Sequence, residues 1–192
     1  MRIPMQLLLA LGILGGAAWV AYAFVPSQCV PVTADTEVFC LRLWSPALFA
    51  MTAGFVGLRR WARGVGWPNA ANGFFIVGVG TLVMAVANVG DYWLLSDIPY
   101  DSPDGVFRAL LSVVLLFGLL LAMVAAFATG LLLVLSGRRT LTSRILGSLM
   151  LSAVCFSVFI GLLAIGPLAA ITCLYGLAIT RTPPQTAELE AA

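Results

Sequence analysis

Long runs of residues without charge decide what this chain can fold into. Ile3 to Val25 is an uncharged run of 23 residues, and Ile145 to Thr180 is another of 36. Because an α-helix rises about 1.5 Å per residue, about 20 apolar residues cross the hydrocarbon core of a bilayer. Only 9% of the 192 residues are charged and 61% are hydrophobic, which leaves too few charges for an ordinary aqueous surface. We therefore expect an all-α, polytopic transmembrane helix bundle with no soluble domain.

Six spans are favoured, and five are possible. The expected spans are about 3–25, 45–62, 73–92, 106–136, 144–164 and 167–181, within one transmembrane domain over residues 1–181. Ser45-Pro46 predicts the start of the second helix, because Ser can cap a helix and Pro fits its first position. Gly166-Pro167 predicts a hairpin between the last two spans. The five-span alternative treats the same dipeptide as a kink within one helix.

The arginines predict the orientation. With six spans, Arg42 and Arg108 lie on one side of the membrane and the other eight arginines on the opposite side. Because basic segments stay in the cytoplasm, we expect both termini to be cytoplasmic and loops 26–44 and 93–105 to be extracytoplasmic. Six of the eight acidic residues lie in or beside these two loops, which supports the orientation independently. The polar tail 182–192 is expected to be disordered and cytoplasmic.

The sequence also gives expectations about the organism that the protein comes from and about the fate of its first span. All ten basic residues are Arg, with neither Lys nor His, which indicates a GC-rich bacterial genome and hence the cytoplasmic (inner) membrane. The first span has an alternative as a cleaved signal peptide, because Arg2 precedes an apolar stretch that ends in Ala21-Tyr22-Ala23.

Cys29 and Cys40 bracket ten residues of the first outer loop. Disulfides persist in an oxidising compartment, and a bridge over so short a loop contributes about 3 kcal/mol on the chain-entropy model. We expect a structural disulfide here, with two free thiols as the alternative. A redox-catalytic pair is not indicated, because the spacing is not C-x-x-C.

The second outer loop is rich in carboxylates and aromatic rings. Its candidate partner-facing residues are Asp97, Tyr100, Asp101 and Asp104. A calcium site is an alternative, but the spacing does not match an EF-hand loop. A plainer interpretation is that Asp91 pairs with Arg108 across the hairpin, Asp104 favours the start of the next helix, and the aromatic rings lie at the membrane interface.

Few polar or sulfur-bearing side chains lie inside the spans. Asn88 and Thr81 are candidates to line a small polar cavity, although helix packing explains such residues equally well. Cys155 and Cys173 could approach one another, but without His or a carboxylate nearby they are expected to be small hydrophobic residues and not metal ligands.

Residue types that the sequence lacks exclude several classes of function. No span carries an ionisable side chain near its middle, which argues against proton relay, and the lack of His excludes Ser-His-Asp and Cys-His catalysis. We expect no cofactor, no metal and no nucleic acid. The sequence favours a non-enzymatic accessory or scaffold subunit, embedded in the lipid bilayer, that binds a membrane-protein partner or copies of itself. The alternative is a facilitator or channel for a small neutral solute.

Overall fold

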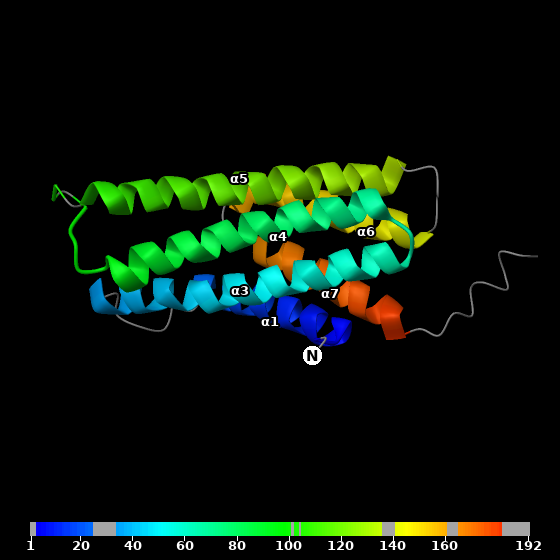
Figure 1. Cartoon of the computed structure of the whole chain (residues 1–192), viewed down its shortest axis with the longest axis horizontal. Helices are drawn as coiled ribbons and strands as arrows, with labels where there is room; N and C mark the ends of the chain where they lie inside the picture. The colour runs from blue at the N-terminus through cyan, green and yellow to red at the C-terminus, as the bar shows by residue number, and fades with distance from the viewer. Residues whose placement is uncertain are drawn as a thin grey trace, which may run out of the picture.

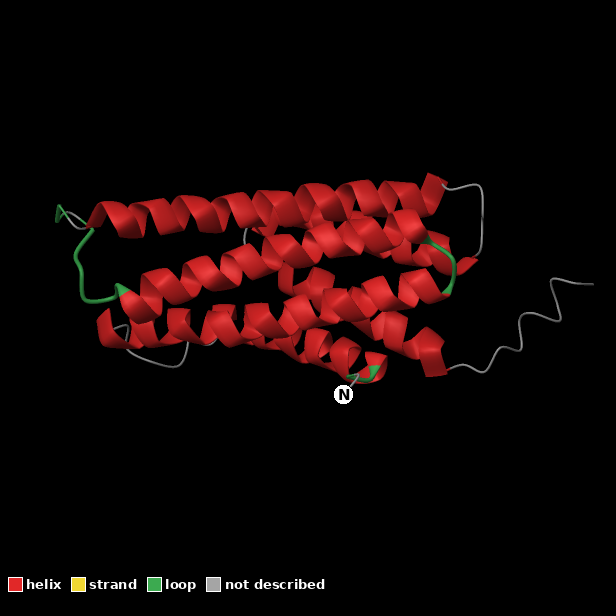
Figure 2. Cartoon of the chain, viewed as in Figure 1, coloured by secondary structure: helices red, strands yellow, loops and turns green. Residues whose placement is uncertain are grey.

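The computed structural model describes residues 3–24, 34–100, 102–103, 105–135, 141–160 and 165–181. Within these ranges the regular structure is entirely helical, and no strand occurs (Figure 2). The helices are α1 (Met5–Phe24), α3 (Ala34–Gly64), α4 (Pro68–Val89), α5 (Gly105–Leu135), α6 (Leu141–Ile160) and α7 (Ile165–Arg181), and a π-helical turn, η1 (Gly90–Leu94), continues α4. The prediction of an all-helical chain is therefore confirmed.

The helices form a closed ring. Each packs against the next one described along the chain, and α7 packs against α1 to complete the circuit. Successive helices run in opposite directions, as the colours in Figure 1 show. α6 and α7 are two antiparallel helices in contact with each other, so the alternative of one kinked helix through Gly166-Pro167 is wrong. The position predicted for the hairpin is also wrong, because Gly166 and Pro167 lie in the first turn of α7, where the missing N–H of a proline breaks no helical hydrogen bond.

Three helices are long and apolar enough to cross a membrane, namely Leu41–Gly64, Pro68–Leu94 and Gly105–Leu135. α1, α6 and α7 contribute shorter apolar helices. These lengths support a membrane-embedded protein, whereas the number of six spans stays a prediction.

The start predicted for the second helix at Ser45-Pro46 is wrong. α3 begins at Ala34, eleven residues earlier, and Pro46 lies inside the helix. A proline within a helix lacks the N–H that would bond the carbonyl four residues before it, which here is the carbonyl of Arg42. The helix continues because a side chain of another helix bonds that carbonyl, as described below.

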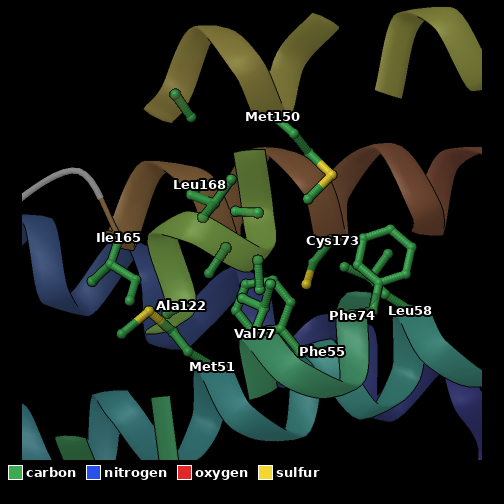
Figure 3. Close-up of a cluster of buried hydrophobic side chains, with 14 of the residues drawn as sticks. Met51, Phe55, Leu58, Phe74, Val77, Ala122, Met150, Ile165, Leu168 and Cys173 are labelled. Atoms are coloured by element: carbon green, nitrogen blue, oxygen red, sulfur yellow. The ribbon is translucent and has the colours of Figure 1, made fainter. Parts of the chain in front are cut away.

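The centre of the ring is filled with apolar side chains from α1, α3, α4, α5, α6 and α7. Figure 3 shows Met51, Phe55 and Leu58 of α3 beside Phe74, Val77, Ala122, Met150, Ile165, Leu168 and Cys173. All ten of these side chains are fully buried. Among the described residues, the core therefore contains no Asp, Glu, Lys, Arg or His side chain.

Small residues let α1, α3 and α7 cross closely. A Cβ atom added to Gly54 would clash with the Cα atom of Gly12 and would lie 2.8 Å from Sγ of Cys173. α4 and α5 meet in the same way, because a Cβ added to Gly80 would lie 2.7 Å from the carbonyl oxygen of Gly118. At both crossings the lack of a side chain on glycine is what allows the backbones to approach so closely.

Candidate functional site

Three elements extend beyond the others at one end of the bundle. α3 and α5 have 31 residues each, whereas α1 and α6 have 20 and α7 has 17. A helix of that greater length spans about 46 Å, more than the roughly 30 Å of a hydrocarbon core. In Figure 1, α3, α4 and α5 reach further than the rest at the end that carries the α4–α5 connection. We call residues 41–46, 88–100 and 105–112 the projecting end.

A buried ion pair lies at the centre of the projecting end. Nε of Arg108, on α5, donates to Oδ1 of Asp91, on η1, over 2.7 Å. The side chain of Asp91 is 3% exposed and that of Arg108 is 8% exposed. The sequence-based prediction of this pair is confirmed.

The connection between η1 and α5 supplies the remaining partners of the ion pair. The hydroxyl of Tyr100 donates to the carboxylate of Asp91, 2.7 Å from Oδ2 and 3.0 Å from Oδ1. Nη1 of Arg108 donates to the carbonyl of Ile98 over 2.6 Å, and its guanidinium lies 3.9 Å from the centre of the Tyr100 ring. Because a buried charge without partners is costly, these contacts hold the connection in one conformation.

Pro46 creates a second link, between α3 and η1. The carbonyl of Arg42 has no helical donor, because residue 46 is a proline. Nε1 of Trp93 donates to that carbonyl over 3.1 Å. The side chain of Arg42 reaches in the opposite direction, and its Nε donates to the carbonyl of Tyr92 over 2.7 Å. Arg42 therefore accepts one hydrogen bond from η1 and donates another to it.

Arg42 also holds the beginning of the α4–α5 connection. Its Nη2 donates to the hydroxyl of Ser96 over 2.9 Å, and that hydroxyl in turn donates to Asp97 over 3.1 Å. Arg42 and Arg108 thus bind the same short segment from two different helices.

The π-helical geometry of η1 sets the direction of the side chains at the end of α4. The N–H of Leu95 bonds the carbonyl of Gly90, five residues earlier, over 3.1 Å. Asp91 is buried in this turn, whereas Trp93 is 52% and Leu94 75% exposed. π-turns are rare and occur often at functional sites. Sequence analysis missed this turn, and nothing in the local residue pattern indicates it.

The predicted partner-facing residues fall into two groups. Asp97 is exposed, and Tyr100 is half exposed while its hydroxyl points back to Asp91. Asp101 and Asp104 lie outside the described residues.

The predicted disulfide is not described either. Cys29 lies outside the described residues, and of Cys40 only the backbone is described, within α3. The disulfide between them stays a prediction.

The candidate cavity residues join α3 to α4. Asn88 accepts a hydrogen bond from Ser45 over 2.5 Å, and Thr81 lies 2.9 Å from Thr52 between hydroxyl oxygens. Asn88 and Thr81 are fully buried, and the amide nitrogen of Asn88 has no partner among the described residues. Asn88 and Thr81 thus lie in the same α3–α4 interface, but each pairs with a different residue of α3.

Sulfur and carboxylate groups do not gather elsewhere in the described part of the chain. Cys155 is exposed and Cys173 is buried, and both are free thiols. Among the described residues, no three His, Cys, Asp or Glu side chains lie close enough together to hold a metal ion.

No family model, curated protein or solved structure matches this chain. The chemistry of the projecting end is therefore the basis for inferring a function.

Removing the charge of Asp91 tests the energetic role of the ion pair. We expect Asp91→Asn to destabilise the fold by about 3–5 kcal/mol, because Arg108 would remain buried without a counter-charge. Thermal unfolding of the purified protein in mild detergent measures the effect. The matched control is Asp97→Asn, which changes an exposed carboxylate of the same segment and should leave the unfolding temperature nearly unchanged. Equal losses in the two variants would contradict a special role for the pair.

The link through Pro46 makes a second prediction. Trp93→Phe removes the donor to the Arg42 carbonyl and should cost about 1 kcal/mol of stability. In a Pro46→Ala background, Trp93→Phe should destabilise the protein less, because the N–H of residue 46 could then bond the carbonyl of Arg42. The four proteins form a double-mutant cycle, in which the apolar contribution of the ring cancels. An identical cost of Trp93→Phe in both backgrounds would show that the carbonyl does not need Trp93.

Proposed function

We propose that this protein is a non-enzymatic accessory or scaffold subunit of a membrane assembly, and that its projecting end binds the partner. The observation that carries the proposal is a fixed polar interior beneath exposed apolar side chains. The exposed fractions are 52% for Trp93, 75% for Leu94, 50% for Tyr100, 59% for Val106 and 66% for Phe107. Trp and Tyr are enriched among the residues that dominate binding energies at protein interfaces.

The buried ion pair supports a binding role more than a purely stabilising one. Apolar side chains of similar volume often stabilise a protein as well as a buried pair does. What the pair of Asp91 and Arg108 adds is a defined geometry, because each charge requires several partners at fixed positions. A surface held in its bound conformation loses less entropy on association and so binds more tightly.

The charges of the second outer loop indicate the chemistry of the partner. Asp91 is neutralised internally by Arg108, which leaves Asp97, Asp101 and Asp104 as the net charge of the segment. A partner with apolar side chains beside basic residues complements this surface. We assign it to another membrane protein, since the projecting end adjoins the bilayer.

The polar side chains of α3 and α4 favour this function over the facilitator. A solute path needs polar groups that converge on one continuous cavity. Here Ser45 pairs with Asn88 and Thr52 pairs with Thr81, two turns apart within the same interface. Thr129 and Thr172 bond carbonyls of their own helices, four residues earlier. These contacts are helix packing, the usual role of such groups in membrane bundles, and of these groups the amide nitrogen of Asn88 lacks a partner among the described residues.

The proposal includes the orientation in a bacterial cytoplasmic membrane. Six spans with both termini in the cytoplasm place the projecting end outside, where loops 26–44 and 93–105 carry most of the acidic residues. The antiparallel ring of helices is compatible with six crossings.

The partner is tested by photo-crosslinking from two positions of equal exposure. Leu94, at the projecting end, and Leu135, at the other end of α5, are each 75% exposed. A photoreactive phenylalanine at residue 94 should capture a stoichiometric partner in native membranes, and the same group at residue 135 should not. Mass spectrometry of the purified adduct identifies the partner.

Three outcomes of this experiment differ in meaning. A specific adduct with another membrane protein at residue 94 supports the proposal. An adduct with a second copy of the chain would replace the hetero-partner by a homo-oligomer. No adduct from residue 94, with no protein co-purifying in mild detergent, would overturn the scaffold function and lead to solute-flux assays in liposomes.

The predicted disulfide of Cys29 and Cys40 is tested by counting thiols. The chain has four cysteines, so the unreduced, denatured protein should take two maleimide tags and the reduced protein four. Because disulfides form outside the cytoplasm, this result would also support the orientation. Four tags without reduction would establish free thiols and remove that support.

A further inference from the structure

The bundle end opposite the projecting end carries arginines that have no carboxylate partner among the described residues. Arg59, Arg60 and Arg63 lie in the last turns of α3, and Arg144 lies in the first turn of α6. Among the side chains that the structure describes, the only carboxylates are Asp91 and Asp97 at the projecting end. The charges at this end are thus uncompensated within the described chain.

Arg59 lies across the outer surface of the α3–α4 pair. Its guanidinium is 4.2 Å from the centre of the Phe75 ring, on α4. Phe75 is 46% exposed, so the cation lies on the outside of the bundle and against an apolar side chain. Nε of Arg59 is buried and has no hydrogen-bond partner among the described residues.

Arg60 and Arg63 have different surroundings. Nη1 of Arg60 donates to the carbonyl of Ile3 over 3.0 Å and so ties α3 to the start of α1. Arg63 is exposed and follows Arg59 by four residues, which places both on the same face of α3. Arg59, which is half-buried, and Arg63, which is exposed, therefore form a pair of neighbouring cations on one face of α3.

The surface beside these cations continues as an apolar stripe along α4. Phe75, Leu82 and Val86 follow at intervals of seven and four residues, which puts them on one face of the helix. Their exposed fractions are 46%, 41% and 57%. The stripe leads from Arg59 toward the projecting end, and so into the bilayer.

We propose that Arg59 and Arg63 bind the phosphate of an anionic phospholipid whose acyl chain lies along the stripe of Phe75, Leu82 and Val86. The planar guanidinium presents paired N–H donors that match phosphate oxygens. A free phosphate would satisfy the cations but not the apolar stripe. A lipid satisfies both, which is the reason for preferring it. This site is independent of the partner surface at the projecting end.

The test is lipid retention by the purified full-length protein. The protein in mild detergent is mixed with phosphatidylglycerol or phosphatidylcholine, and bound lipid is measured by native mass spectrometry together with the unfolding temperature. We expect selective retention of phosphatidylglycerol and a raised unfolding temperature. Replacing Arg59 or Arg63 by Gln should weaken phosphatidylglycerol binding about tenfold, the loss expected for one charge-assisted contact.

Arg144→Gln is the matched control, because it removes an exposed arginine at the same end of the bundle. Its lipid binding should equal that of the unaltered protein. Arg59→Lys serves as a second variant that keeps the charge but loses the planar donor pair, and it should bind more weakly than the unaltered protein while remaining folded.

Three results would overturn the proposal. Equal retention of the two lipids would remove the requirement for an anionic headgroup. An equal loss in Arg144→Gln and Arg59→Gln would indicate diffuse charge attraction in place of a site. Stabilisation by millimolar inorganic phosphate or glycerol 3-phosphate that matches that of the lipid would assign the cations to a soluble anion.

Discussion

The structure of the projecting end depends on a hydrogen bond to the carbonyl of Arg42. Pro46 leaves it without a helical donor, and Trp93 supplies one from η1. The side chain of the same arginine then binds the carbonyl of Tyr92 and the hydroxyl of Ser96. With η1 held against α3, Asp91 is turned into the bundle, where it requires a cation. Arg108 provides that cation, and thereby fixes α5 to the end of α4.

Much of this architecture follows from simple features of the sequence, and some does not. Uncharged runs between arginines predicted the helices, and opposite charges on two sides of a hairpin predicted the pair of Asp91 and Arg108. The helix start predicted at Ser45-Pro46 was wrong because a proline is compatible with two positions. It fits the first turn of a helix, and it also fits the interior when another donor bonds the carbonyl four residues earlier. That donor, Trp93, lies 51 residues from Arg42, so no local pattern contains it.

For the candidate site residues too, the sequence predicted local features but not contacts between distant segments. The sequence identified Asn88 and Thr81 as polar groups that need partners. Each has one partner on α3, but the sequence could not tell a shared cavity from two separate pairs. That distinction depends on the register of α3 against α4, which brings Ser45 to Asn88 and Thr52 to Thr81. Glycine crossings such as Gly12 on Gly54 set this kind of register through tertiary packing.

The two ends of the bundle differ in how their charges are satisfied, and this difference bears on function. At the projecting end the buried charges of Asp91 and Arg108 have internal partners, and exposed apolar side chains surround them. At the opposite end Arg59 lies over Phe75, and its Nε has no hydrogen-bond partner among the described residues. Between them lies an apolar core with no Asp, Glu, Lys, Arg or His among its members. The proposed scaffold function rests on this arrangement, in which apolar packing fills the middle of the bundle and the charged groups lie at its two ends.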